Sequence, residues 1–192
     1  MVAYGLLVAG WVAYFLLHSV LAAAQVKQWA YRWLSQRGYR LAYSGFALTG
    51  LLLLLLVNGS IPAAYFMPSE GAIRFTRLLL TTFGVIIVQV SFRSYSLKAF
   101  LGLTAENASL LKTDGILKYV RHPLYTGTIL ITLGFFLFIP NLPTLISCGC
   151  VLLYLPIGIW LEERKLVQQF GDAYRDYQKR VPALIPWPWA KN

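Results

Sequence analysis

Charged side chains are scarce in this chain. Of its 192 residues, only 12% are Asp, Glu, Lys or Arg, whereas 58% are hydrophobic, and the mean hydropathy is +0.60. A water-soluble domain carries roughly 25% charged residues. The composition therefore excludes a soluble enzyme, a disordered regulator and a disulfide-stapled secreted domain, and it indicates an integral membrane protein.

Metal ligands and thiols are also few. The chain has two histidines, His18 and His122, and two cysteines, Cys148 and Cys150. Residues two apart on a helix point to different faces, so the cysteines are interpreted as packing residues rather than as a disulfide or a metal pair. The sequence contains no zinc-binding, dinucleotide-binding or P-loop signature. We therefore predict no metal site.

Five segments lack charged residues altogether: 2–24, 41–57, 78–92, 124–139 and 142–161. About 20 apolar residues cross a bilayer as a helix. The pattern predicts an all-α protein, a polytopic membrane helical bundle of about five transmembrane helices. We expect a single integral membrane domain over 1–192, with amino-terminal spans in 1–100 and a functional loop, a helical hairpin and a lid helix in 101–192.

The basic residues are distributed unevenly between the two sides of these spans. All of the 17 Lys and Arg residues except Arg74 and Arg77 fall in the first loop, the third loop or the tail. By the positive-inside rule, the amino terminus is expected outside and the carboxy terminus in the cytoplasm, in a bacterial inner membrane. The net charge of +10 is then explained by topology and by anionic membrane lipid, so nucleic acid is not an expected partner.

Ionisable residues gather where the last two spans begin and end. Arg121 and His122 precede the fourth span, and Glu162 and Glu163 follow the fifth. The turn 140–143 is too short for anything but an antiparallel hairpin, and the two helices would be roughly 26 and 29 Å long. We therefore predict that the two cations meet the two carboxylates at one membrane surface.

An amphipathic pattern follows the carboxylates. Apolar and aromatic residues recur at three- and four-residue spacing from Leu166 to Val181, and Pro182 ends the pattern. This predicts a helix on the cytoplasmic side. The pattern fits two arrangements, a lid over the hairpin and an interfacial helix resting on lipid headgroups.

The predicted pocket combines cationic, anionic and aromatic groups at a membrane surface. Such a pocket suits a zwitterionic cofactor with an additional positive charge, such as S-adenosylmethionine. Its carboxylate pairs with Arg or His, its ammonium pairs with Glu, and its sulfonium tolerates an aromatic face.

Two strings in the chain resemble a known family. YVRHPLYTG and EERKLVQQFGDAYRDYQKRVPALIP are similar to segments of the membrane methyltransferases typified by isoprenylcysteine carboxyl methyltransferase and bacterial phospholipid methyltransferases, over roughly residues 110–188. The amino-terminal string WVAYFLLHSVLAAAQVKQW, around His18, resembles the methanethiol S-methyltransferase and NnrU-like branch. Where the family has Gly-Pro-Tyr, this chain has Gly115, Ile116 and Leu117, so one aromatic contact is expected to be missing.

The resemblance implies an S-adenosylmethionine-dependent methyltransferase and assigns residues to its site. Cofactor binding would fall to Leu111, Gly115, Tyr119, Val120, His122, Tyr125, Glu162 and Glu163. Arg121 and Glu163 would be catalytic, Arg121 near the transferred methyl group and Glu163 as a proton acceptor. Candidate acceptor contacts are His18, Gln89, Arg93 and Arg180. For His18, a hydrogen bond between helices is the favoured alternative.

The expected acceptor is a lipophilic or small thiol, amine or carboxylate at the cytoplasmic face. Two other functions remain open at the level of sequence. A membrane reductase of related architecture would bind NADPH. The phosphates of NADPH favour a site with more cations and fewer carboxylates, so the adjacent Glu162 and Glu163 argue against this function. A non-catalytic, NnrU-like membrane scaffold would keep the fold without the chemistry.

Overall fold

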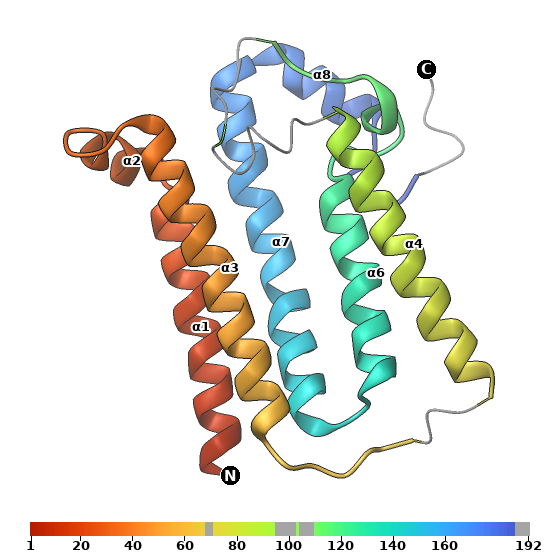
Figure 1. Ribbon diagram of the computed structural model, residues 1–192. Helices are drawn as coiled ribbons and strands as arrows, with labels where there is room; N and C mark the ends of the chain where they lie inside the picture. The colour runs from red at the N-terminus through yellow and green to blue at the C-terminus, as the bar shows by residue number, and fades with distance from the viewer. Residues whose placement is uncertain (68–70, 95–102, 104–109, 187–192) are drawn as a thin grey trace. The chain divides into compact units, whose positions relative to one another are not determined.

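The structure is a computed structural model that describes residues 1–67, 71–94, 103 and 110–186. The helices are α1 (Val2–Ala22), α2 (Ala24–Ala30), α3 (Gln36–Ser60), α4 (Ala72–Ser94), the 3-10 helix η1 (Gly115–Lys118), α6 (Pro123–Phe138), α7 (Leu142–Phe170) and α8 (Asp172–Arg180) (Figure 1). Within the described residues, the only β pairing is an isolated bridge between Tyr65 and Asn141. The predicted all-α class is confirmed.

Four helices are long and apolar enough to cross a membrane: α1, α3, α4 and α7. The predicted third span, 78–92, lies inside α4, whose 23 residues are ample for a crossing. The predicted fourth span is the shorter apolar helix α6, with 16 residues. At ~1.5 Å per residue, α6 is about 24 Å long, somewhat less than the ~30 Å of a hydrocarbon core. α6 begins at Pro123, a first-turn position that tolerates the missing N–H of proline.

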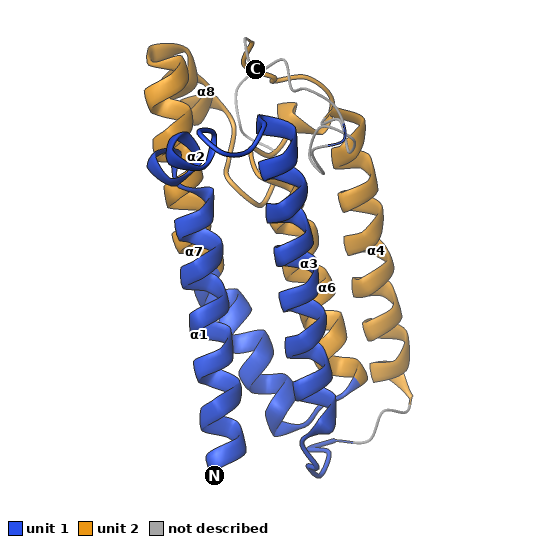
Figure 2. Cartoon of the chain, turned by 60° about the vertical axis from the view of Figure 1, so that its left-hand side comes forward, with its two compact units in different colours: residues 1–68, 97–106, 139–154 blue, residues 69–96, 107–138, 155–192 orange. Residues whose placement is uncertain are grey.

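The chain divides into two compact units (Figure 2). The first contains Met1–Pro68, Leu97–Glu106 and Ile139–Tyr154, and the second contains Ser69–Ser96, Asn107–Phe138 and Leu155–Asn192. The boundary divides α7 between the two units. The expectation of a single membrane domain over 1–192 stays a prediction.

The first unit is held together by a buried polar chain as well as by apolar packing. Trp11 of α1 donates through its indole N–H to Ser147 Oγ at 3.0 Å, and Ser147 in turn donates to Asn58 Oδ1 at 2.8 Å. Asn58 Nδ2 donates to Thr144 Oγ1 at 3.2 Å. Because lipid offers these groups no alternative partner, the chain of bonds ties α1, α3 and the first half of α7 in one register.

In the second unit, α4 and α6 pack closely through glycine. A Cβ placed on Gly84 would lie 2.8 Å from the carbonyl oxygen of Gly127, and one placed on Gly127 would lie 2.6 Å from Val88 Cγ2. Only residues without a side chain allow this approach, as is typical of helix packing in membranes. The contact fixes α6, the helix that directly follows Arg121 and His122.

The amphipathic pattern predicts one continuous helix, whereas the structure divides this segment between α7 and α8. Its first residues extend α7 to Phe170, so Glu162 and Glu163 lie on that helix rather than beyond it. Gly171, at φ +56°, then turns the chain into α8. Tyr174 and Tyr177 of α8 are buried against the second unit. The aromatic face of α8 therefore packs on protein. Of the two arrangements that the sequence pattern fits, this is the lid and not the helix resting on lipid headgroups.

Candidate functional site

The candidate site begins where the carboxy-terminal segment crosses the start of α6. The backbone N–H groups of Arg121 and His122 donate to the carbonyls of Pro182 and Ala183, each at 2.9 Å. Thr126 Oγ1 donates to the carbonyl of Leu184 at 2.7 Å. Residues 182–184, called the strap below, thus fix the backbone of both cationic residues.

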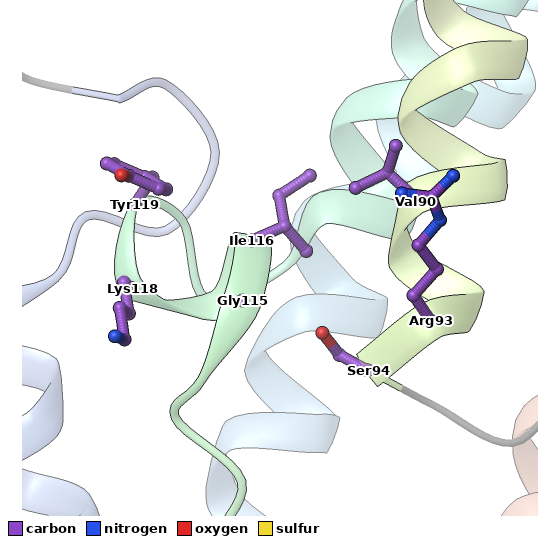
Figure 3. A pocket seen from close by; sticks show the side chains of 7 residues that line it. All are labelled: Val90, Arg93, Ser94, Gly115, Ile116, Lys118 and Tyr119. Carbon is purple, nitrogen blue, oxygen red and sulfur yellow. The ribbon is translucent and has the colours of Figure 1, made fainter.

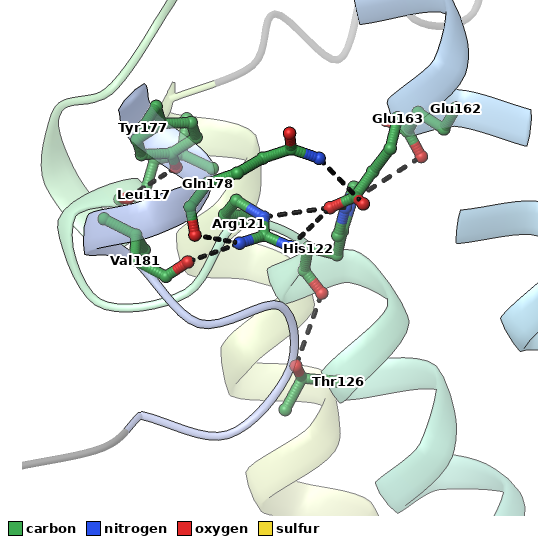
Figure 4. A network of polar contacts seen from close by, with 9 residues as sticks. All are labelled: Leu117, Arg121, His122, Thr126, Glu162, Glu163, Tyr177, Gln178 and Val181. Atoms are coloured by element: carbon green, nitrogen blue, oxygen red, sulfur yellow. Dashed lines mark hydrogen bonds and ion pairs between the residues drawn. The ribbon is translucent and has the colours of Figure 1, made fainter. Parts of the chain in front are cut away.

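The structure brings the predicted cations and carboxylates into direct contact (Figure 4). Arg121 donates to Glu163 Oε1 from Nε at 2.9 Å and from Nη2 at 2.6 Å. His122 Nε2 lies 3.0 Å from the same oxygen, and His122 Nδ1 lies 3.7 Å from Glu162 Oε2. The hairpin geometry read from the sequence therefore gives the observed arrangement.

Arg121 also binds the end of α8. Its Nη1 donates to the carbonyls of Gln178 at 2.8 Å and Val181 at 2.6 Å, groups that a helix terminus leaves without intrahelical partners. Gln178 Nε2 in turn donates to Glu163 Oε2 at 3.0 Å. Arg121 therefore joins α6, α7 and α8, and most of its donors are already engaged.

The two carboxylates have different surroundings and hence different chemistry. Oε1 of Glu163 lies among three nitrogens of Arg121 and His122, an environment that favours the ionised form and makes this group a weak base. The side chain of Glu162 is 44% exposed, whereas that of Glu163 is 20% exposed. Glu162 is thus the carboxylate that is accessible to a cationic group of a ligand.

Two tyrosines of α8 complete the network. Tyr177 donates to the carbonyl of Leu117 at 2.6 Å, and burial raises its pKa to about 12, so it stays a donor at physiological pH. Burial also raises the pKa of Tyr174, and the neighbouring Glu163 carboxylate adds to this effect. Tyr174 is only 1% exposed, and its hydroxyl has no hydrogen-bond partner in the described part of the chain. Tyr174 is thus a buried donor whose acceptor the described residues do not supply.

Sequence reasoning missed Tyr174 and Gln178 as members of the site. The apolar periodicity around Tyr174 indicated a buried position but gave no sign that its hydroxyl would be unpaired. Gln178 lies among charged residues on α8, and nothing in its spacing from Glu163 distinguishes it. The turn at Gly171 decides which of these side chains faces α7.

The predicted cofactor residues fall into two groups. Tyr125 joins His122, Glu162 and Glu163, its ring edge-to-face with the imidazole at 5.6 Å between centroids. Gly115, Tyr119 and Val120 instead line two hollows beside the network. Leu111 is half-buried and lines neither.

The larger hollow has a volume of about 510 Å³ and lies between the end of α4 and η1 (Figure 3). It is lined by Val90, Arg93, Ser94, Gly115, Ile116, Lys118 and Tyr119. The smaller hollow, of about 270 Å³, is lined mainly by apolar side chains of α4, α6 and the strap, and it shares Ile116 and Tyr119 with the larger one.

The four candidate acceptor contacts are divided between the two units. His18 belongs to the first unit, where its Nε2 lies 2.9 Å from the hydroxyl of Tyr43, so it makes the interhelical bond favoured for it. Gln89, Arg93 and Arg180 belong to the second unit. Gln89 is exposed, Arg93 lines the larger hollow, and Arg180 Nε donates to a carbonyl of its own helix, that of Asp176, at 3.3 Å.

These features define a class: a polytopic helical membrane protein with an Arg–His–carboxylate network under a carboxy-terminal lid helix. Comparison with known proteins then identifies the family. The chain belongs to the NnrU family, whose model matches residues 6–187.

The similar proteins are named methyltransferases. The chain is 31% identical to methanethiol S-methyltransferase 1 of Bradyrhizobium diazoefficiens over 88% of this chain and 62% of that protein. It is also 31% identical to a methanethiol S-methyltransferase of Crocosphaera subtropica, over 91% of this chain and 71% of that protein. With protein-S-isoprenylcysteine O-methyltransferase of Schizosaccharomyces pombe it shares 42% identity over 40% of this chain and 33% of that protein. No solved structure matches.

These findings confirm the family resemblance read from the sequence, in the carboxy-terminal part and along the chain. The chain spans 62% of the length of the Bradyrhizobium relative and 71% of the Crocosphaera relative.

Proposed function

We propose that this protein is an S-adenosylmethionine-dependent integral membrane methyltransferase. Its acceptor is a lipophilic or small nucleophile at the cytoplasmic face, in a bacterial inner membrane with the amino terminus outside. The observation that carries this proposal is the contact of Arg121 and His122 with Glu163, beside the accessible carboxylate of Glu162. The names of the relatives support the same class of reaction.

The residues present fit such a cofactor. Glu162 is exposed enough to bind an ammonium group, and the buried hydroxyl of Tyr174 lacks an acceptor that a carboxylate could supply. The Tyr125 ring beside His122 offers an aromatic face to a sulfonium. When bound, the cofactor supplies an electrophilic methyl group.

Arg121 and Glu163 are proposed to act mainly through position. Glu163 holds Arg121 and His122 with one oxygen and Gln178 with the other. Arg121 in turn holds the end of α8, and with it the lid, over the site. This refines the catalytic role that the sequence suggests for both residues, because their donors and acceptors are largely engaged with each other.

The acceptor's proton then has two candidate destinations. One is His122, whose Nδ1 lies 3.7 Å from Glu162 Oε2, and the other is the accessible carboxylate of Glu162. A thiol, with an ordinary pKa of about 8.5, would lose its proton to either group. Its sulfur would then bond to the methyl carbon as the methyl–sulfonium bond breaks, with S-adenosylhomocysteine as the leaving group. Holding the acceptor and the methyl group in one orientation would lower the barrier further.

A thiol is the favoured acceptor among thiols, amines and carboxylates. The proteins that match along most of this chain are named methanethiol S-methyltransferases, whereas the isoprenylcysteine enzyme matches only 40% of it. His18, Gln89, Arg93 and Arg180 remain candidate acceptor contacts under this proposal.

Thermal unfolding with S-adenosylhomocysteine and with NADPH separates the proposed enzyme from a reductase. At a ligand concentration about 100 times its dissociation constant, the stabilisation is about 2.7 kcal/mol. For a chain of this size, that raises the unfolding temperature by roughly 5–10 °C. We expect this shift with S-adenosylhomocysteine alone, and stabilisation by NADPH alone would contradict the proposal.

A matched pair of variants tests the site. Glu162→Gln is expected to abolish the shift with S-adenosylhomocysteine, whereas Asp172→Asn, at a carboxylate that is 88% exposed on α8, retains it. The scaffold alternative predicts a different result. It is supported if Glu162→Gln and His122→Ala leave ligand binding and cellular phenotype intact while changes in α8 abolish a protein association.

A further inference from the structure

One face of α4 runs from apolar to basic along the two hollows. Phe83 and Ile87 line the smaller hollow, whereas Val90 and Ser94 line the larger one. Their spacing of four, three and four residues places them on a single helix face. From Phe83 to Ser94 the distance along the axis is roughly 16 Å at ~1.5 Å per residue. The hollows therefore follow one another along the helix.

The larger hollow is lined by two basic side chains that form no ion pair with any described residue. Arg93 and Lys118 both line it, and neither has an ion-pair partner in the segments that the structure describes. Lys112 donates to the carbonyl of Ser94 at 3.0 Å and adds a third cation beside the hollow. Figure 3 shows Arg93 on α4 and Lys118 on η1, with the side chain of Ile116 extending from η1 toward α4.

The smaller hollow is apolar in character. The hydroxyl of Thr126, which belongs to its lining, is already bonded to the strap carbonyl of Leu184. The side chains of Phe83 and Ile185 line the same hollow and are 56% and 73% exposed. Such a surface fits hydrocarbon rather than a hydrogen-bonding ligand.

The two hollows share a wall made by Ile116 and Tyr119. An anionic head in the larger hollow and a hydrocarbon chain in the smaller one would therefore belong to one molecule. Among the described residues, the lining of the larger hollow contains Arg93 and Lys118 but no carboxylate, which disfavours the ammonium and sulfonium of the proposed cofactor. Basic pockets beside membrane helices are suited to anionic lipid headgroups.

We propose that these hollows bind one anionic phospholipid, with its phosphate between Arg93 and Lys118 and an acyl chain against Phe83, Ile87 and Leu130. In this proposal Arg93 binds lipid, which replaces the acceptor contact considered for it above. The lipid supports η1, the segment that leads directly into Arg121 and His122. The site involves no methyl transfer, so it stands or falls independently of the proposed reaction.

Native mass spectrometry of the full chain in an uncharged detergent tests this site. The probes are phosphatidylglycerol and phosphatidylcholine with the same acyl chains. We expect preferential retention of one phosphatidylglycerol per wild-type chain. Arg93→Gln with Lys118→Gln should weaken this retention by about tenfold or more, since each cation near an anionic lipid contributes substantially. Arg32→Gln with Arg37→Gln, which removes the same charge from exposed positions in the turn before α3 and in its first turn, should leave it unchanged.

Two further arms separate the head from the tail. Ile87→Trp, which fills the apolar hollow, should reduce retention of both lipids, and millimolar inorganic phosphate should not displace phosphatidylglycerol. Equal retention of the two lipids by wild type, equal loss in both double variants, or full displacement by phosphate would each overturn the proposal. Should the double variant unfold, Lys118→Gln alone, at an exposed position of η1, gives the same comparison.

Discussion

At the residue scale, one carboxylate organises the site. Glu163 is the common partner of Arg121, His122 and Gln178, so three elements depend on a single side chain. The Arg121 side chain is only 11% exposed. Removing its partner therefore leaves a largely buried charge without compensation, which costs more than the loss of a surface ion pair.

Glu163→Gln is accordingly expected to lower the free energy of unfolding by about 1–3 kcal/mol. Asp172→Asn removes a carboxylate from an exposed pair with Arg175. This change should alter the free energy of unfolding by less than about 1 kcal/mol. Thermal or chemical unfolding of both variants in the same detergent measures the difference. Equal effects would show that the network contributes no more than a surface pair.

Tyr177 predicts a pH dependence. Its pKa is raised from 10 to about 12, so the protonated form is favoured by folding. The stabilising contribution is fully present below pH 10 and is lost as the pH rises through 12. Tyr177→Phe should be less stable than wild type by about 1 kcal/mol at neutral pH, and this difference should shrink and then reverse as the pH rises from 10 to 12, because the buried site disfavours the ionised phenol. A difference that persists at high pH would contradict this assignment.

The sequence predicts the charged members of the site better than the neutral ones. Arg121, His122 and Glu163 were placed together because a short turn forces two helices of similar length to return to the same depth. Tyr174 and Gln178 depend on the direction in which α8 leaves α7. That direction is set by the φ of Gly171, which a helical periodicity does not encode.

At the element scale, the contact between α4 and α6 positions α6, and with it Arg121 and His122, which directly precede that helix. A Cβ on Gly84 would meet the Gly127 carbonyl at 2.8 Å, whereas one on Gly45 of α3 would meet no atom within 4 Å. The same substitution therefore has opposite consequences at the two positions. Alanine is favoured over glycine in a helix by roughly 1 kcal/mol, provided that there is space for it.

Gly84→Ala is expected to destabilise the protein by about 1–3 kcal/mol through overpacking. Gly45→Ala should leave stability unchanged or raise it by up to about 1 kcal/mol. The unfolding temperatures of the two variants provide the test. A Gly84→Ala protein as stable as Gly45→Ala would show that α4 and α6 do not pack through these glycines.

The extent of the helices was less predictable than their existence. Charge-free runs located the apolar part of each span but missed the extension of α7 through Glu162 to Phe170. Charged residues continue a helix readily once its apolar part is anchored, because they are good helix formers. The same reasoning explains why α4 is longer than the charge-free segment 78–92 that marked it.

At the scale of the whole molecule, the basic residues predict the orientation in the membrane. Arg32 lies in the first loop, on the side of the membrane that is predicted to hold most of the cations. Arg74 lies at the start of α4, on the other side by the same prediction. Both residues are exposed. With Cys148 and Cys150 replaced by serine, Arg74→Cys should react with a membrane-impermeant maleimide in intact spheroplasts. Arg32→Cys should react only after lysis. The reverse pattern would overturn the proposed topology.

Transfer of a labelled methyl group tests the central claim most directly. The purified chain in phospholipid vesicles, given S-adenosylmethionine with an isotopic methyl label and a small thiol, should form labelled thioether. His122→Ala should reduce this rate by at least about 100-fold if the imidazole acts in proton transfer, while Asp172→Asn should not. No transfer to thiol, amine or carboxylate acceptors by a folded wild-type chain that also fails to bind S-adenosylhomocysteine would contradict the account.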